Sequence, residues 1–124
     1  MIVAVARLSL YIPHSHSLKD KRAVLRKIVD RTQARFKLHV AEVGSQDVWQ
    51  RAEVGFAVVS GDGALAEALV DDVVRSIHGV VARDGQGEVV AVDRDVIRYG
   101  EGGAGFGQGH GHGHGHGKWG GGDV

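Results

Sequence analysis

Residues 17–37 read SLKDKRAVLRKIVDRTQARFK and combine a helix start signal, an apolar stripe and many basic side chains. Ser17 opens a Ser-Leu-Lys-Asp sequence that approximates a capping box, with Asp20 at the third helical position. Apolar positions then recur at close to 3.6 residues, namely Leu18, Leu25, Ile28, Val29, Thr32 and Phe36. The stretch therefore predicts a long helix with one face in a hydrophobic core.

The same stretch is strongly basic. It holds eight Lys and Arg residues against two Asp, whereas the whole chain of 124 residues carries 15 basic and 15 acidic residues. Such charge separation predicts one positive surface directed at an anionic partner. The candidate nucleic-acid-binding residues are Lys19, Lys21, Arg22, Arg26, Lys27, Arg31 and Arg35.

Strand patterns lie on both sides of this helix. Residues 2–12 alternate between two faces, and Pro13 ends the strand because it has no N–H to donate. A second strand is expected around residues 38–43, and alternation over residues 51–60 predicts a third strand in a hairpin with it. The turn between them is expected at residues 44–47.

A second helix is expected next, because Asp62 can cap it and an apolar face follows. Gly79 occupies a position suited to a left-handed residue just past the helix end. After a loop at residues 84–87, residues 88–98 have the pattern of a fourth strand.

The resulting order, β-α-β-β-α-β, predicts an α+β fold, the ferredoxin-like sandwich of a four-stranded antiparallel sheet with two helices on one face. The other face of the sheet would then be uncovered, with Val3 and Val5 on it. An open apolar face of this kind predicts a homodimer. The alternative is a face of small residues that tolerates water.

Residues 100–124 differ in composition from residues 1–99, which are long enough for one domain. Residues 109–117 read GHGHGHGHG, which predicts a disordered tail rather than a second core. The imidazoles of His110, His112, His114 and His116 could chelate Ni²⁺, Zn²⁺ or Cu²⁺. A low-complexity extension without a metal role is the alternative.

Composition excludes some classes of protein. The chain has no cysteine, which excludes disulfides and thiolate metal sites. The apolar stretch at residues 1–12 is too short to span a bilayer and has no basic segment before it, so we expect a cytoplasmic protein without a membrane partner.

The predicted hairpin around residues 42–51 is a second candidate site. Trp49 at a hairpin end is typical of a binding anchor, with Asp47 and Arg51 beside it as candidate partner-binding residues. Glu42 and Arg51 could face each other as a charged pair. Alternatively, Trp49 packs over a sheet edge while Asp47 and Arg51 hold the turn. A carboxylate and an Arg without a nearby His make a poor hydrolytic site, which favours a non-enzymatic protein.

Two segments resemble the YlxP-like family of small uncharacterised bacterial proteins. HSLKDKRAVLRKI at residues 16–28 is similar to the family pattern S-L-K-E/D-K-R, and AEVGSQDVWQRAEVGFAVVS at residues 41–60 is similar to A-E-V-x-x-x-D-x-W-Q-R. The resemblance covers about residues 1–98 and implies a ferredoxin-like fold, dimerisation, and gene neighbours that encode translation-initiation and ribosome-maturation factors. It implies no enzyme activity or cofactor, and it does not extend to the Gly/His tail.

The leading hypothesis is a non-enzymatic dimer that binds structured RNA or a ribosomal subunit through the basic helix. Lys and Arg neutralise phosphates and displace counterions, and the helix lacks the interleaved aromatics of single-strand binders. A solvated helix face neutralised by acidic neighbours is the alternative for the helix. Metal buffering by the tail and a protein–protein module anchored by Trp49 are the alternative functions.

Overall fold

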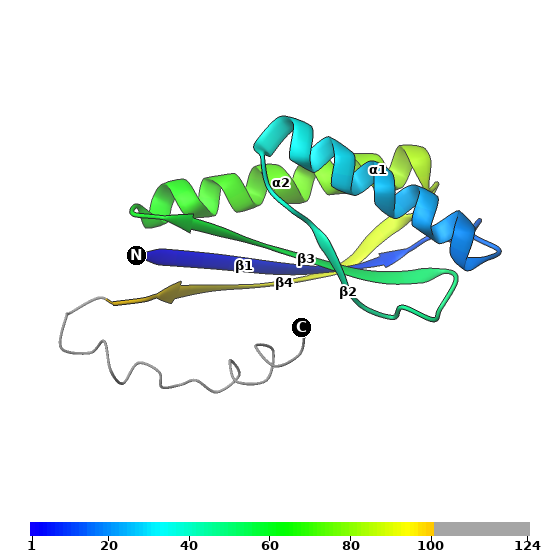
Figure 1. Cartoon of the computed structure of the whole chain (residues 1–124), viewed down its shortest axis with the longest axis horizontal. Helices are drawn as coiled ribbons and strands as arrows, with labels where there is room; N and C mark the ends of the chain where they lie inside the picture. Colours follow the sequence, from blue (N-terminus) through cyan, green and yellow to red (C-terminus); the bar gives the residue numbers. More distant parts are fainter. Residues whose placement is uncertain (101–124) are drawn as a thin grey trace.

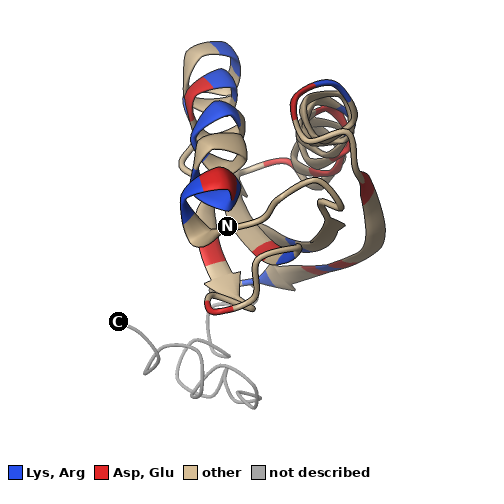
Figure 2. Cartoon of the chain, turned by 90° about the vertical axis from the view of Figure 1, so that its right-hand side faces the viewer, with Lys and Arg blue, Asp and Glu red and all other residues tan. Residues whose placement is uncertain are grey.

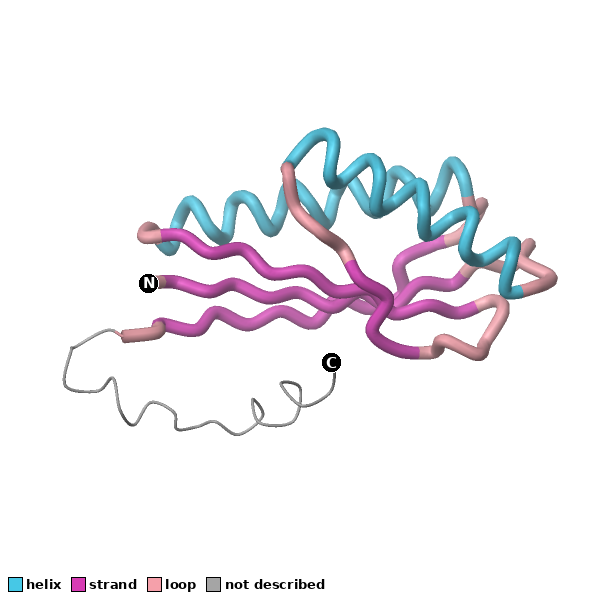
Figure 3. Tube along the Cα trace, in the orientation of Figure 1, coloured by secondary structure: helices cyan, strands magenta, loops and turns pink. Residues whose placement is uncertain are grey.

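In the computed structural model, which describes residues 1–100, six elements follow one another in the predicted order. They are β1 (Ile2–Tyr11), α1 (Leu18–Phe36), β2 (Ala41–Gly44), β3 (Arg51–Ser60), α2 (Gly63–Asp84) and β4 (Glu88–Arg98). The strands form one antiparallel sheet in the order β2-β3-β1-β4, and both helices cover the same face of it (Figures 1 and 3). The prediction of a ferredoxin-like βαββαβ fold is confirmed.

The core lies between the sheet and the helices, and the strand period of two explains which side chains enter it. On β1 the buried residues are Ile2, Ala4, Ala6, Leu8 and Leu10, which alternate with Val3 and Val5 on the opposite face. Their neighbours in β3 follow the same alternation, since Ala6 pairs with Phe56 and Leu8 with Val54. Helix α2 contributes the buried side chains of Val73, Ile77 and Val80 to this core.

Helix α2 extends past the end predicted from the sequence. It continues through Gly79 to Asp84, so the prediction that Gly79 ends the helix is wrong. The apolar face decides this, because Ile77, Val80 and Val81 are all buried and keep the helical period across the glycine. The helix ends instead at Gly85, whose N–H donates to the carbonyl of Val81.

The hairpin has a shorter first strand than expected. Strand β2 begins only at Ala41 and includes a register shift between Glu42 and Gly44, whereas β3 and β4 have the predicted bounds. Ala41 still pairs with Gly55, so the predicted β2–β3 hairpin is confirmed.

Within residues 1–100, no helix or strand covers the sheet face opposite the two helices, as the sequence predicts (Figure 1). Val5, Ala41 and Ala57 line a hollow of about 620 Å³ over this face, and Val59 is 64% exposed at one end of β3. One ion pair crosses the face, from Arg7 Nη2 to Asp93 Oδ2 at 2.9 Å. The hydrogen bond to Asp93 raises the pKa of Arg7 above its ordinary value.

Candidate nucleic-acid interface

Two hydrogen bonds define where the basic helix α1 begins. Ser17 Oγ accepts a hydrogen bond from the Asp20 N–H at 3.0 Å, and Asp20 Oδ2 accepts one from the His16 N–H at 2.9 Å. Ser17 therefore caps the helix as the sequence predicts, whereas the Asp20 carboxylate binds the N–H of His16, one residue before the N-cap, which is a variant of the capping box. The cap satisfies one of the free N–H groups at the helix start, that of Asp20.

Six of the seven predicted cations are exposed on α1. Lys and Arg positions recur along this helix (Figure 2). The six exposed cations form two groups, because residues three or four apart share a side of a helix. One group is Lys19, Arg22 and Arg26, and the other is Lys27, Arg31 and Arg35. From Lys19 to Arg35 the two groups extend over roughly 24 Å of helix, at 1.5 Å per residue.

These six cations have few acidic partners within residues 1–100. Lys27 Nζ lies 4.0 Å from Asp84 Oδ1, and the other five make no salt bridge with any residue in that range. Asp30 lies among the first group and lines a shallow hollow with Arg22 and Arg26. The described part of the chain therefore leaves most of the positive charge of α1 unneutralised.

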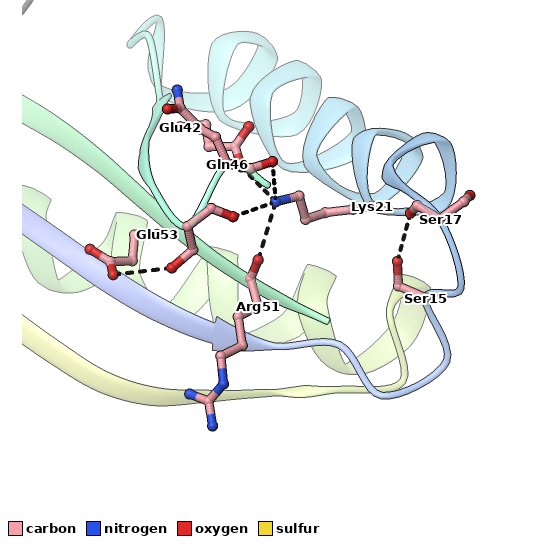
Figure 4. A network of polar contacts seen from close by, with 8 residues as sticks. Ser15, Ser17, Lys21, Glu42, Gln46, Arg51 and Glu53 are labelled. Carbon is pink, nitrogen blue, oxygen red and sulfur yellow. Dashed lines mark hydrogen bonds and ion pairs between the residues drawn. The ribbon is translucent and has the colours of Figure 1, made fainter. Parts of the chain in front are cut away.

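Lys21 is the exception, and its assignment to the nucleic-acid-binding surface is wrong. Its side chain is 1% exposed and points under the helix toward the β2–β3 hairpin (Figure 4). Lys21 Nζ donates to the carbonyls of Ser45, Gln46 and Arg51 at 2.8, 3.2 and 3.2 Å. Because these three bonds use all the ammonium protons, its 2.9 Å contact with Glu42 Oε2 is an ion pair without a further hydrogen bond.

The sequence did contain a signal for this burial. Position 21 lies four residues before Leu25 and seven before Ile28, so it falls on the apolar stripe. A Lys at that position must either bend outward or find partners inside. Burying an ammonium is costly unless it is paired and hydrogen-bonded, and here four oxygens surround it.

The hairpin residues lie where the sequence placed them, but their contacts differ from the prediction. Asp47, Trp49 and Arg51 are all exposed, Trp49 to 52%. The expected pair between Glu42 and Arg51 is wrong, since Glu42 contacts Lys21 instead. Glu42 is paired with the buried Val54, so it faces the helices, and Arg51 lies three residues from Val54 on the opposite face.

Gln50 holds this loop, and the sequence reasoning gave it no role. Its side chain donates to the carbonyls of Pro13 and Ser15 at 3.1 and 3.4 Å, and its own carbonyl accepts from the Ile12 N–H at 2.8 Å. Ser45 Oγ also donates to Glu53 across the hairpin. The loop that carries Trp49 is therefore fixed to the segment before α1 and to α1 itself.

The four tail histidines, His110, His112, His114 and His116, lie outside the described residues. Within residues 1–100, no group of three or more His, Asp or Glu side chains is arranged to hold a metal ion. No helix in that range combines the length and apolar character needed to cross a membrane.

The fold and the contacts of Lys21 define a small ferredoxin-like α+β domain with a basic first helix and a hairpin bound to that helix. Comparison with known sequences gives the family. The chain belongs to the family described as protein of unknown function DUF503, whose sequence model matches residues 3–94. It is also 37% identical over 76 residues to the uncharacterized protein YlxP of Bacillus subtilis (strain 168), covering 61% of this chain and 83% of that protein. The resemblance to a YlxP-like family is confirmed.

The chain is also similar to solved structures at low sequence identity. The Bacillus subtilis protein YxeP, a dinuclear metal-binding peptidase of the M20 family, has a TM-score of 0.50 at 14% identity, over 78% of this chain and 26% of that one. A dimeric ferredoxin-like protein from an uncultured marine organism has a TM-score of 0.48 at 7% identity, over 78% and 96%. A C-terminal segment of the alpha subunit of aIF2 from Pyrococcus abyssi has a TM-score of 0.45 at 16% identity, over 80% and 51%. The chain thus spans about half of the aIF2 segment and about a quarter of the peptidase.

Proposed function

We propose that this protein binds structured RNA, without catalysis, through the exposed cations of α1. The observation that carries the proposal is the pair of cation groups on α1, of which only Lys27 has an acidic partner within residues 1–100. Unneutralised Lys and Arg along one helix favour contact with successive backbone phosphates, because binding releases the counterions condensed on the nucleic acid.

The arrangement of the cations suits a double-helical or folded backbone. The two groups point to different sides of α1, so they can reach phosphates on two strands. Between Lys19 and Arg35 the helix has no aromatic side chain on which an unstacked base could rest. Proteins recognise duplex RNA mainly through its shape and its backbone, so a basic helix face without aromatic side chains suits it.

The resemblance to the YlxP-like family supports a ribosomal source for this RNA, because it implies gene neighbours that act in translation initiation and ribosome maturation. A ribosomal subunit is thus the first target to examine. The basic face of α1 and the hairpin with Trp49 are separate surfaces in this proposal, and only the first is assigned to RNA.

The test is co-sedimentation of the full chain with ribosomal subunits across a salt series at constant Mg²⁺, with a variant lacking residues 109–117 run in parallel to exclude metal bridging by the tail. Replacing Arg22 and Arg26 by Gln should make the negative slope of log affinity against log salt shallower by roughly two, at about 0.9 per lost phosphate contact. The matched control replaces Arg51 and Arg75, which lie off α1, by Gln with the same change in net charge. Equal losses in both variants, or free protein at every salt concentration, would reject the proposal.

A second candidate function rests on the sequence GHGHGHGHG at residues 109–117. We propose that these four imidazoles bind a divalent transition metal independently of the core. Deleting residues 109–117 should abolish Ni²⁺ or Zn²⁺ binding in calorimetry while co-sedimentation stays unchanged. Binding should weaken as the pH falls through about 6.5, since protonated imidazole has no lone pair to donate. Metal binding that survives the deletion would contradict this assignment.

A further inference from the structure

A hollow of about 440 Å³ lies between the two helices. Arg31, Ala34 and Arg35 of α1 line one side, and Ser76, Val80 and Arg83 of α2 line the other. Three arginines from two helices therefore border the same space, and none of the six lining residues is acidic. Sequence reasoning gave no role to Ser76 or Arg83.

Gly79 explains how Arg83 lies over this part of α2. A Cβ atom at Gly79 would lie 3.0 Å from Nη1 of Arg83, so the guanidinium rests directly over the glycine one turn earlier. Glycine destabilises the middle of a helix relative to alanine. Its presence in a 22-residue helix, at a position that does not end the helix, leaves room for this guanidinium.

The other two arginines are close together on α1. Arg31 and Arg35 are one turn apart, where like charges destabilise a helix. The guanidinium of Arg35 lies over the ring of Phe36, 4.9 Å from its centroid, which restricts its movement. Within residues 1–100 neither Arg31, Arg35 nor Arg83 makes a salt bridge, and Asp84 beside Arg83 is directed toward Lys27.

Helix dipoles explain only part of the clustering of Arg31, Arg35 and Arg83 around the hollow. A cation in the last turn of a helix is favourable, which suits Arg35 in α1 and Arg83 in α2. The dipoles do not explain why Arg31 and Arg83 meet Arg35 in one hollow that has no acidic side chain. An anion between the helices would relieve the repulsion among all three.

We propose that the hollow bordered by Arg31, Arg35 and Arg83 is a phosphate-binding site. The planar forks of guanidinium groups match the oxygens of a phosphate and can each donate two parallel hydrogen bonds. Ser76 adds a neutral hydroxyl donor from α2. The phosphate group can belong to an RNA backbone, in which case the inference rests on the function proposed above, or to a small phosphorylated molecule.

The first test is titration of the isotope-labelled full chain with inorganic phosphate at constant ionic strength, following the Arg Nε–H signals by NMR. The signals of Arg31, Arg35 and Arg83 should move together and saturate, while that of Arg75 should not. Arg83→Gln should weaken phosphate binding about tenfold, the loss of one charge-assisted contact. The control Arg75→Gln removes the same charge from the same helix outside the hollow. Equal weakening by both variants, or no saturable shift, would overturn the proposal.

A second variant separates the site from the stability of the helix. Gly79→Ala places a methyl group where the guanidinium of Arg83 rests, and this flexible side-chain end must move away. Alanine favours a helix more than glycine does, so the variant should melt at a higher temperature and yet bind phosphate more weakly. A variant that is stabilised and binds phosphate as well as the parent chain would contradict the role given to Gly79 and Arg83.

The source of the phosphate follows from repeating the Arg83→Gln comparison with a duplex RNA. Loss of both phosphate and RNA affinity places an RNA backbone in the hollow. Loss of phosphate binding with unchanged RNA affinity assigns the site to a small phosphorylated molecule. Phosphate binding in a chain that binds no RNA would reject the proposed function and leave the phosphate site standing.

Discussion

Lys21 of α1 and Glu42 of β2 form an ion pair of 2.9 Å in which the lysine side chain is 1% exposed. The two residues belong to the two segments that carry the family resemblance, residues 16–28 and 41–60. These segments thus meet in one buried contact, in which Lys21 also binds the carbonyls of Ser45, Gln46 and Arg51 (Figure 4). The second lysine of SLKDKR therefore fastens the hairpin to α1.

Lys21→Met should destabilise the protein strongly. The substitution leaves the Glu42 carboxylate and three carbonyls without their cation, and breaking a buried pair in this way costs about 3 kcal/mol. Urea denaturation measures the loss. Adding Glu42→Gln should recover part of it, because the remaining uncompensated charge is then removed.

The matched control for this variant is Arg22→Met, one residue further along α1 and exposed. It should change the free energy of unfolding by no more than about 0.5 kcal/mol. If the two methionine variants lose similar stability, Lys21 does not have the buried role described here.

Two glycines should respond in opposite ways to alanine. A Cβ at Gly87 would lie 2.0 Å from the carbonyl oxygen of Tyr11, a backbone atom that cannot easily move, whereas a Cβ at Gly61 would meet nothing within 4 Å. Gly87→Ala should therefore cost about 3 kcal/mol through overpacking, and Gly61→Ala should be neutral. Thermal denaturation of both variants tests this, and equal melting temperatures would contradict the close approach of Gly87 to β1.

Trp49 should contribute little to folding. Truncating a core tryptophan to alanine lowers the free energy of unfolding by about 3–5 kcal/mol. Trp49, however, is 52% exposed, and Gln50 and Lys21 hold its loop. We expect Trp49→Ala to cost less than about 1 kcal/mol. If urea denaturation shows a loss in the free energy of unfolding as large as that for a core tryptophan, Trp49 packs over the sheet edge. A small loss leaves Trp49 free to anchor a partner.

The open face of the sheet should mediate self-association. Ala57 is exposed near the middle of β3 and borders the apolar hollow there. We expect the chain to sediment as a dimer and Ala57→Glu to convert it to a monomer, because a carboxylate would have to be buried. The control Ala82→Glu places the same charge on the exposed side of α2. A monomeric parent chain, or equal behaviour of both variants, would contradict the prediction.

Local patterns determined the elements of this fold. The Ser17 capping box, the period of two in β1 and the 3.6-residue stripe of α1 each depend on neighbours within a few residues. Those patterns predicted the element order and the bounds of β3 and β4, and six of the seven cations predicted to be exposed on α1 are exposed. Among the element bounds, the prediction erred at Gly79, where the buried apolar face of α2 continues the helix past a short-range stop signal. It also erred at the start of β2, where pairing with β3 begins only at Ala41.

The sequence alone could therefore specify a βαββαβ chain with a basic first helix, because hydrophobic period and capping chemistry act locally. Only the tertiary structure decided that Lys21 turns inward to Glu42, since that contact needs the hairpin to lie beneath α1. The same holds for Arg83, which joins Arg31 and Arg35 across two helices. Burial and charge pairing depend on residues far apart in the chain, and their distances exist only once the sheet and helices have packed.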